Sequence, residues 1–206
     1  MRLQTALDAV PVIAILRASS AKRFAEVTET LCAAGIRAVE FTLTTPGALE
    51  ALRECAGTSA EFALGAGTVL SSDEARQAVD AGASYLISPA VCLDVVAEAR
   101  SLGVLALPGA YTPSEILSAW RAGATMVKLF PAGTGGLPYF TAVRAPLPRI
   151  PLVPTGGIGL DDAAAYLAAG ARAVGMGGAL IGDACEDGDL AALRGRAAAL
   201  VDRLRR

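Results

Sequence analysis

Short apolar runs alternate with longer stretches of helical periodicity, and this alternation limits the folds that the chain can adopt. The runs are Pro11–Arg17, Ala38–Leu43, Glu61–Val69, Tyr85–Pro89, Val104–Gly109, Met126–Pro131, Pro151–Gly157 and Ala173–Gly178. The helical stretches are Ala21–Ala34, Gly47–Gly57, Ser71–Ala81, Val91–Leu102, Pro113–Ala122, Leu137–Ala145, Leu160–Ala169 and Asp189–Arg205. Strands that are apolar on both faces and alternate with helices are typical of a parallel sheet covered by helices.

A repeated phrase supports this order. In Ala33–Ala38, Asp80–Tyr85, Arg121–Met126 and Ala168–Ala173, a glycine follows a helical stretch and leads into the next strand, as a left-handed helix cap does. We therefore expect residues 1–206 to form a single α/β domain, a (β/α)8 TIM barrel with a C-terminal helix at 189–205. A doubly wound open sheet is the alternative, although it normally has fewer strands for this length.

The composition excludes several classes of protein. Hydrophobic residues make up 53% of the chain, charged residues 18%, and the net charge is −2, which favours a compact globular protein over a disordered or nucleic-acid-binding one. No apolar stretch is long enough to span a bilayer, and the N-terminus lacks a signal-peptide pattern, so we expect a cytoplasmic protein without a membrane partner. The four cysteines lie singly, without metal-ligand spacing, as free thiols do.

The chain contains no histidine, and this absence restricts its chemistry. A His-ligated zinc site, a Ser-His-Asp triad and a Cys-His pair are all impossible. Proton transfer must fall to a carboxylate, a lysine, a tyrosine or water. We expect no metal and no cofactor.

Lys128 is one of only two lysines, and it lies inside the apolar run Met126–Pro131. Burying an ammonium is costly unless it is paired or loses its proton. Lysine can lose that proton and attack a carbonyl, whereas arginine cannot. A lysine at the end of a hydrophobic strand therefore indicates a Schiff-base nucleophile, and the alternative is a lysine whose ammonium extends into solvent. Lys22, in a polar stretch, has the features of an ordinary exposed residue.

Glu40 and Arg17 are the other charged residues that we place at strand ends among apolar neighbours. Active sites of barrels lie at the C-terminal ends of the strands. There, Glu40 would take and give protons, with burial raising and a nearby ammonium lowering its pKa. The guanidinium of Arg17 can grip a carboxylate with two hydrogen bonds. The alternatives are a structural carboxylate paired with Arg17 or Arg37 and a surface arginine.

Glycine pairs follow the seventh and eighth expected strands, at Gly156-Gly157 and Gly177-Gly178. Barrels of this class bind phosphate at this place through backbone N–H groups. Gly65-Ala66-Gly67-Thr68 lacks the dinucleotide-binding and P-loop patterns. We interpret it as close packing that brings the hydroxyl and backbone of Thr68 to a substrate carboxylate.

Taken together, these segments resemble the 2-keto-3-deoxy-6-phosphogluconate (KDPG) aldolase family. The residues that carry the resemblance are Ala14–Arg17, Val39–Leu43, Gly65–Val69, Ile87–Pro89, Lys128–Pro131 and Pro154–Ile158. The resemblance extends from Val10 to Gly182, with the segments in the same order as in the family. Near relatives in the family act on 2-keto-3-deoxy-6-phosphogalactonate and on 4-hydroxy-2-oxoglutarate.

The resemblance implies a class I aldolase, a carbon–carbon lyase of the Entner–Doudoroff pathway that is usually trimeric. It would cleave a phosphorylated 2-keto-3-deoxy sugar acid to pyruvate and glyceraldehyde 3-phosphate. Lys128 would form the Schiff base, and Glu40 would move protons through a water molecule. Other implied roles are the pyruvyl site for Thr68, Pro89 and Phe130, a place beside the imine for Thr155, and phosphate binding for Gly156, Gly157, Gly177 and Gly178.

Two departures from the family pattern bear on the substrate. Thr44 stands where many gluconate-type members have a carboxylate-binding arginine, so Arg17 would take that role, as in galactonate-type relatives. Ala179 stands where many members have a serine near the phosphate. The choice between the epimers and activity on 4-hydroxy-2-oxoglutarate stay open.

Two other functions also remain possible. One is a phosphate-binding barrel isomerase or decarboxylase, although the aspartates expected around the lysine of such a decarboxylase are absent around Lys128. The other is a non-catalytic barrel that binds a sugar acid.

Overall fold

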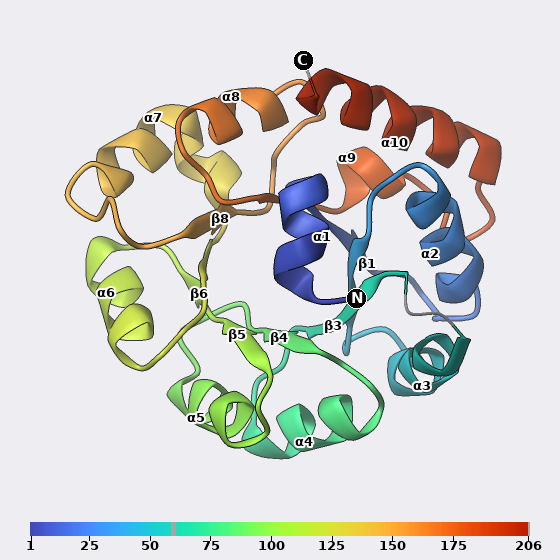
Figure 1. Ribbon diagram of the computed structural model, residues 1–206, viewed down its shortest axis with the longest axis horizontal. Coiled ribbons are helices and arrows are strands. Elements are labelled where there is room, and N and C mark those ends of the chain that lie inside the picture. Colours follow the sequence, from blue (N-terminus) through green and yellow to red (C-terminus); the bar gives the residue numbers. More distant parts are fainter. Residues whose placement is uncertain (59–60, 206) are drawn as a thin grey trace.

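The computed structural model describes residues 1–58 and 61–205 and has an α/β fold, in which an outer ring of helices surrounds parallel strands (Figure 1). The strands are β1 (Val12–Leu16), β2 (Ala38–Thr42), β3 (Ala63–Gly67), β4 (Tyr85–Ile87), β5 (Leu105–Leu107), β6 (Gly109–Ala110), β7 (Val127–Leu129), β8 (Leu152–Pro154) and β9 (Val174–Met176). The larger sheet has the order β5-β4-β3-β2-β1-β9 and the smaller the order β6-β7-β8. Each paired strand is parallel to its neighbour.

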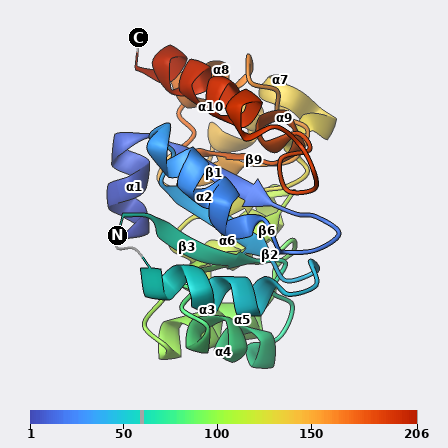
Figure 2. The same cartoon turned by 90° about the vertical axis from the view of Figure 1, so that its right-hand side faces the viewer.

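The helices of the outer ring follow the strands along the chain, and Figure 2 shows them from the side. They are α2 (Phe24–Ala33), α3 (Ala48–Thr58), α4 (Ser72–Asp80), α5 (Leu93–Ser101), α6 (Pro113–Arg121), α7 (Ala132–Arg144), α8 (Ala163–Ala168) and α10 (Leu190–Leu204). The short helix α9 (Gly178–Ile181) lies inside α10 in Figure 1. Local signals start several of them: Thr112 and Glu115 form a capping box before α6, and Asp189 caps α10. Within the described residues, no helix is long and apolar enough to cross a membrane.

The sequence pattern missed helix α1 (Leu3–Ala9), which lies at the centre of Figure 1. Its Leu3, Ala6 and Leu7 are buried and belong to the same apolar cluster as Ile13 of β1 and Tyr85 of β4. The helix has seven residues and no side-chain N-cap, so its ends carry no local signal. Packing against the strands holds it in place, and it covers one end of their interior.

Other boundaries differ for identifiable reasons. The expected strand Val104–Gly109 is divided into β5 and β6 at Pro108, because proline has no N–H for the ladder. Helix α7 begins at Ala132 instead of Leu137, and it contains a kink at Gly136, whose φ of 64° and ψ of −168° are not helical. The expected strand Ala173–Gly178 ends at Met176, where the short helix α9 follows.

Apolar side chains form two clusters, one inside the curved strands and one between strands and helices. Successive strand residues point to opposite faces. In β2, Ala38 therefore belongs to the inner cluster, whereas Val39 and Phe41 belong to the outer one. The same alternation turns Glu40 inward. The four cysteines, all at described positions, form no disulfide; Cys32, Cys55 and Cys185 are buried and Cys92 is half-buried.

Candidate active site

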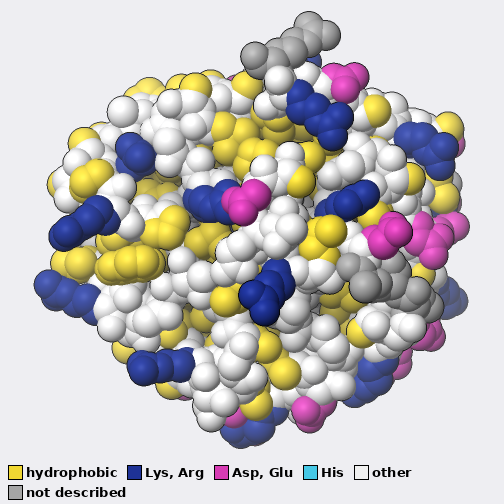
Figure 3. All heavy atoms as spheres, in the orientation of Figure 1, with side chains coloured by type: hydrophobic (Ala, Val, Ile, Leu, Met, Phe, Trp, Pro, Cys, Tyr) yellow, Lys and Arg dark blue, Asp and Glu magenta, His cyan; other side chains and the backbone are white. Residues whose placement is uncertain are grey.

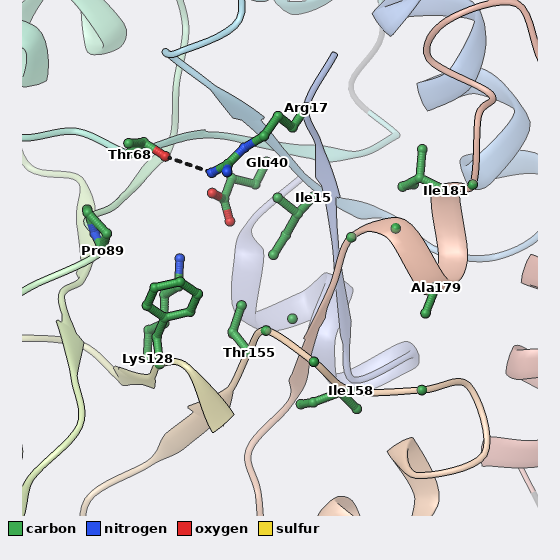
Figure 4. A pocket seen from close by; sticks show the side chains of 18 residues that line it. Ile15, Arg17, Glu40, Thr68, Pro89, Lys128, Thr155, Ile158, Ala179 and Ile181 are labelled. Atoms are coloured by element: carbon green, nitrogen blue, oxygen red, sulfur yellow. Dashed lines mark hydrogen bonds between the residues drawn. The ribbon is translucent and has the colours of Figure 1, made fainter. Parts of the chain in front are cut away.

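A cavity of about 740 Å³ opens at the C-terminal ends of the strands. All the site residues that the sequence predicted line this cavity, and Figure 4 shows several of them from close by. They are Arg17, Glu40, Thr68, Pro89, Lys128, Phe130, Thr155, Gly156, Gly157, Gly177 and Gly178. The sequence separates them by up to 161 positions, and the parallel strands bring them to one edge.

Lys128 is the central residue of β7 and is 7% exposed. Its neighbours Val127 and Leu129 pack into the outer cluster, so the lysine points the other way, into the cavity. The Nζ atom lies 4.8 Å from the centre of the Phe130 ring, a cation–π distance. The amine is thus held in a largely apolar place and lines the cavity.

Glu40 is 1% exposed, and its Oε2 atom has no hydrogen-bond partner among the described residues. Burial raises the pKa of this carboxyl above its usual range, while the charges of Lys128 and Arg17 act in the opposite direction. A carboxyl with a raised pKa and a free oxygen is suited to exchanging protons with a ligand.

Two glycines of β3 make room for the groups around Glu40. A Cβ atom at Gly67 would lie 1.7 Å from Oε1 of Glu40, and one at Gly65 would lie 2.1 Å from the ring of Tyr85. Tyr85 is fully buried below the site and donates a hydrogen bond of 2.7 Å to the carbonyl of Val39, next to Glu40. The Gly-Ala-Gly segment is therefore close packing, as predicted, but the side chains that it accommodates are Tyr85 and Glu40.

The raised pKa of Glu40 predicts that Glu40→Gln raises the melting temperature at pH 8 and changes it little at pH 4. The native state binds this proton more tightly than the unfolded chain. The stabilising contribution of the group is therefore complete below the unfolded pKa of about 4.3 and is lost as the pH rises through the native pKa. Thermal unfolding at both pH values checks this, with the exposed Glu29→Gln as the control. An equal difference at both pH values would contradict it.

Arg17 follows β1 directly and lies above Glu40 in Figure 4. Its Nη2 atom donates a long hydrogen bond of 3.5 Å to Oγ1 of Thr68, which follows β3. Thr68 has a φ of 59°, a conformation that is strained for a β-branched residue. Strain of this kind occurs where surrounding structure imposes it, often at ligand sites. Arg17 and Thr68 thus place a guanidinium and a hydroxyl at the same side of the cavity.

The glycine pairs line the cavity where the chain leaves β8 and β9, and β9 lies beside β1. Gly156 has a φ of 84°, and a Cβ atom there would lie 2.8 Å from the Phe130 ring. Gly177 precedes α9, whose first N–H groups have no acceptor within the helix. Backbone donors without side chains in front of them suit an anion.

Sequence reasoning missed further residues that line the cavity: Ile15, Ile158, Gly159, Gly175, Ile181 and Gly182. Ala179, which the family resemblance placed near the phosphate, lines the cavity as well. Gly175 is required by packing, because a Cβ atom there would lie 2.3 Å from Oγ1 of Thr155, its partner in an isolated bridge. Period-two alternation along β1 could have identified Ile15. The others lie on loops or on α9, whose conformation no short sequence pattern predicts.

Comparison with known proteins agrees with this arrangement. The family model described as KDPG and KHG aldolase matches residues 3–195. A 2-dehydro-3-deoxy-phosphogluconate aldolase from Treponema pallidum is 37% identical over 164 residues, which cover 79% of this chain and 78% of the relative. A protein from Rhizobium meliloti, described as a probable 2-dehydro-3-deoxy-6-phosphogalactonate aldolase, is 34% identical over 182 residues, 87% of this chain and 86% of the relative.

Among solved structures, the KDPG aldolase of Legionella pneumophila superposes with a TM-score of 0.88 at 28% identity, over 97% of this chain and 98% of that one. That structure contains pyruvate captured as a covalent carbinolamine intermediate. The match of the family model spans most of the chain, and the two relatives exceed 30% identity over most of their length. The chain therefore belongs to the KDPG and KHG aldolase family.

Proposed function

We propose that this protein is a class I aldolase, a carbon–carbon lyase, which cleaves a 2-keto-3-deoxy-6-phospho sugar acid to pyruvate and glyceraldehyde 3-phosphate. One observation carries the proposal: a lysine that is 7% exposed and a carboxylate that is 1% exposed line the same cavity, and the carboxylate has an unpartnered oxygen. A buried amine that can lose its proton is a nucleophile for a keto group. The covalent pyruvate adduct of the Legionella relative supports this chemistry.

In the proposed mechanism, the neutral amine of Lys128 attacks the keto carbon and forms a carbinolamine. Loss of water gives a protonated imine, which accepts electrons from the neighbouring carbon–carbon bond. Glu40, acting through a water molecule, takes the proton of the C4 hydroxyl as that bond breaks, so the aldehyde leaves and an enamine stays on Lys128. Return of the proton to the enamine carbon, followed by hydrolysis of the imine, releases pyruvate and restores the amine.

The remaining residues would bind the two ends of the substrate. Arg17 and Thr68 would hold the carboxylate, because they supply the cation and hydroxyl near Glu40. Pro89, Phe130 and Thr155 would pack around the pyruvyl group and the imine. The phosphate would lie against the backbone of Gly156, Gly157, Gly177 and Gly178.

Three further properties belong to the same proposal. The two sheets would together form one (β/α)8 barrel. On one side β5 and β6 are separated only by Pro108, and on the other an isolated bridge joins Thr155, after β8, to Gly175 of β9. The family resemblance favours a homotrimer in the cytoplasm. Sedimentation equilibrium of the purified protein tests the trimer.

Replacing Arg17 with alanine should remove about 1.5–3 kcal/mol of transition-state stabilisation, measured as a decrease in kcat/KM. This is the typical contribution of a hydrogen bond to a charged group. Arg17→Lys should recover only part of this, because an ammonium cannot reproduce the planar fork of a guanidinium. Arg17→Ala should also bind pyruvate more weakly, since pyruvate has the carboxylate but no phosphate. If pyruvate binding were normal and only phosphorylated substrates bound poorly, Arg17 would belong to the phosphate end.

Treatment with EDTA should leave activity unchanged. The chain has no histidine for a zinc site, and in the proposed mechanism the imine on Lys128 accepts the electrons. The measurement is the cleavage rate before and after dialysis against the chelator. Loss of activity that a divalent cation restores would favour the metal-dependent decarboxylase alternative.

A retro-aldol assay tests the proposed function. The phosphorylated gluconate and galactonate epimers and 4-hydroxy-2-oxoglutarate are supplied separately, and pyruvate is measured as it forms. Release of pyruvate from a phosphorylated epimer supports the proposal, and the preferred epimer identifies the substrate. Release only from 4-hydroxy-2-oxoglutarate would favour that alternative. No release from any of the three would favour a non-catalytic barrel.

A further inference from the structure

Arg17 lies just beyond the end of strand β1, so the hydrogen bonds of the strand do not fix its backbone. Strand β1 ends at Leu16, and the Arg17 side chain is exposed, with a long hydrogen bond to Thr68. A flexible side chain with few contacts reaches one place consistently only if its backbone is fixed. The groups that hold the backbone on either side of Arg17 therefore bear on how it meets a ligand.

Two buried threonines supply these contacts. Oγ1 of Thr42, the last residue of β2, donates a hydrogen bond of 3.1 Å to the carbonyl of Leu16. Oγ1 of Thr45 accepts one of 3.3 Å from the N–H of Ala18. The two hydroxyl oxygens are 3.1 Å apart, and the residues are 0% and 2% exposed.

Counting donors fixes the direction of this network. A hydroxyl has one proton to donate. Thr42 uses its proton on the carbonyl of Leu16, which can only accept, so Thr45 must donate its own proton to Thr42. The result is a one-way chain from the N–H of Ala18 through Thr45 and Thr42 to the carbonyl of Leu16. Both ends lie on the immediate neighbours of Arg17, and successive bonds in such a chain strengthen one another.

We propose that the Thr42–Thr45 hydroxyl pair positions Arg17 for binding the substrate carboxylate. Neither threonine is among the residues that line the cavity, so both are positioning residues that act through Arg17. The inference rests on the proposed function, since it requires a carboxylate ligand at Arg17. It assigns a role to Thr42 and Thr45 that is separate from the chemistry at Lys128.

Valine tests the pair because it keeps the shape of threonine and lacks the hydroxyl. In trapping of pyruvate by borohydride, Thr42→Val and Thr45→Val should each raise the pyruvate concentration for half-maximal trapping about tenfold. The limiting rate should stay within about twofold, since Lys128 is untouched. Thr42→Ser and Thr45→Ser, which retain the hydroxyl, should restore most of the affinity. Loss of affinity in both the valine and the serine variants would indicate packing and contradict the proposal.

Thr28→Val is the matched control. Thr28 is 0% exposed, and its hydroxyl donates to the carbonyl of Phe24 within helix α2, away from Arg17. We expect Thr28→Val to lower the melting temperature, as we also expect of Thr42→Val and Thr45→Val. Unlike them, it should leave the pyruvate affinity unchanged. A similar loss of affinity in Thr28→Val would show that any buried hydroxyl deletion has this effect, and the proposal would fail.

The decisive comparison repeats Thr45→Val in the Arg17→Ala background. If the pair acts through Arg17, the second substitution should cause little further loss of affinity. A further loss of about tenfold would show that Thr45 acts independently of Arg17. Absence of trapping in the wild-type protein would overturn the proposed function together with this inference, whereas normal wild-type trapping with insensitive threonine variants would overturn the inference alone.

Discussion

Lys128→Arg is expected to reduce turnover to less than about a hundredth of the wild-type rate, with the fold intact. Arginine keeps the positive charge and much of the volume, but it cannot lose its proton to become a nucleophile. Lys128 is the single amine that lines the cavity, so no other described residue there can replace it. The measurement is the steady-state rate of pyruvate release.

The chain offers a matched control for this substitution. Lys22 is the other lysine, and it is exposed, outside the cavity. Lys22→Arg makes the same chemical change and should leave the rate unaltered. Circular dichroism and thermal unfolding of both variants establish that they are folded. Retention of more than about a hundredth of the activity in Lys128→Arg would remove the Schiff-base assignment.

Glu40→Gln is expected to lower the rate of proton transfer by roughly 10²–10⁴ while leaving Lys128 able to react slowly with pyruvate. Glutamine has nearly the same shape, but its amide cannot act as a general acid or base. Exchange of the methyl protons of pyruvate with deuterated solvent isolates this step, because it requires formation of the enamine without any aldehyde. NMR follows the exchange directly.

The outcome of that experiment separates a catalytic from a structural carboxylate. The exposed Glu29→Gln controls for the loss of one negative charge and should exchange at the wild-type rate. Unchanged exchange in Glu40→Gln would mean that the buried carboxylate only organises charge around Arg17 and Lys128. The mechanism would then need another group for proton transfer.

The sequence predicted which strand residues line the cavity, because their direction depends on periodicity. Lys128 and Glu40 each lie on a strand between apolar residues that pack outward, so period-two alternation turns both toward the interior. Parallel strands then bring their C-terminal ends to one edge. The topology thus brings residues that are far apart in the sequence to one edge of the sheet. The charged residues among them can be recognised in the sequence because their neighbours are apolar.

The features that could not be predicted depend on individual contacts between distant segments. The hydroxyl of Tyr85 bonds to Val39, 46 positions away, and Thr42 bonds to Leu16, 26 positions away. Neither contact has a local sequence signal. Helix α1 is likewise stabilised by its burial against the strands. Figure 3 shows the face on which α1 lies, in the orientation of Figure 1, and there hydrophobic and charged side chains are intermixed.

Borohydride reduction in the presence of pyruvate tests the Schiff base on Lys128 most directly. The intact mass of the treated protein shows whether a covalent adduct has formed, and peptide mapping shows which of the two lysines carries it. The account predicts one reduced pyruvyl group on Lys128 in the wild-type protein and in Lys22→Arg, and none in Lys128→Arg. Absence of an adduct, or an adduct confined to Lys22, would contradict it.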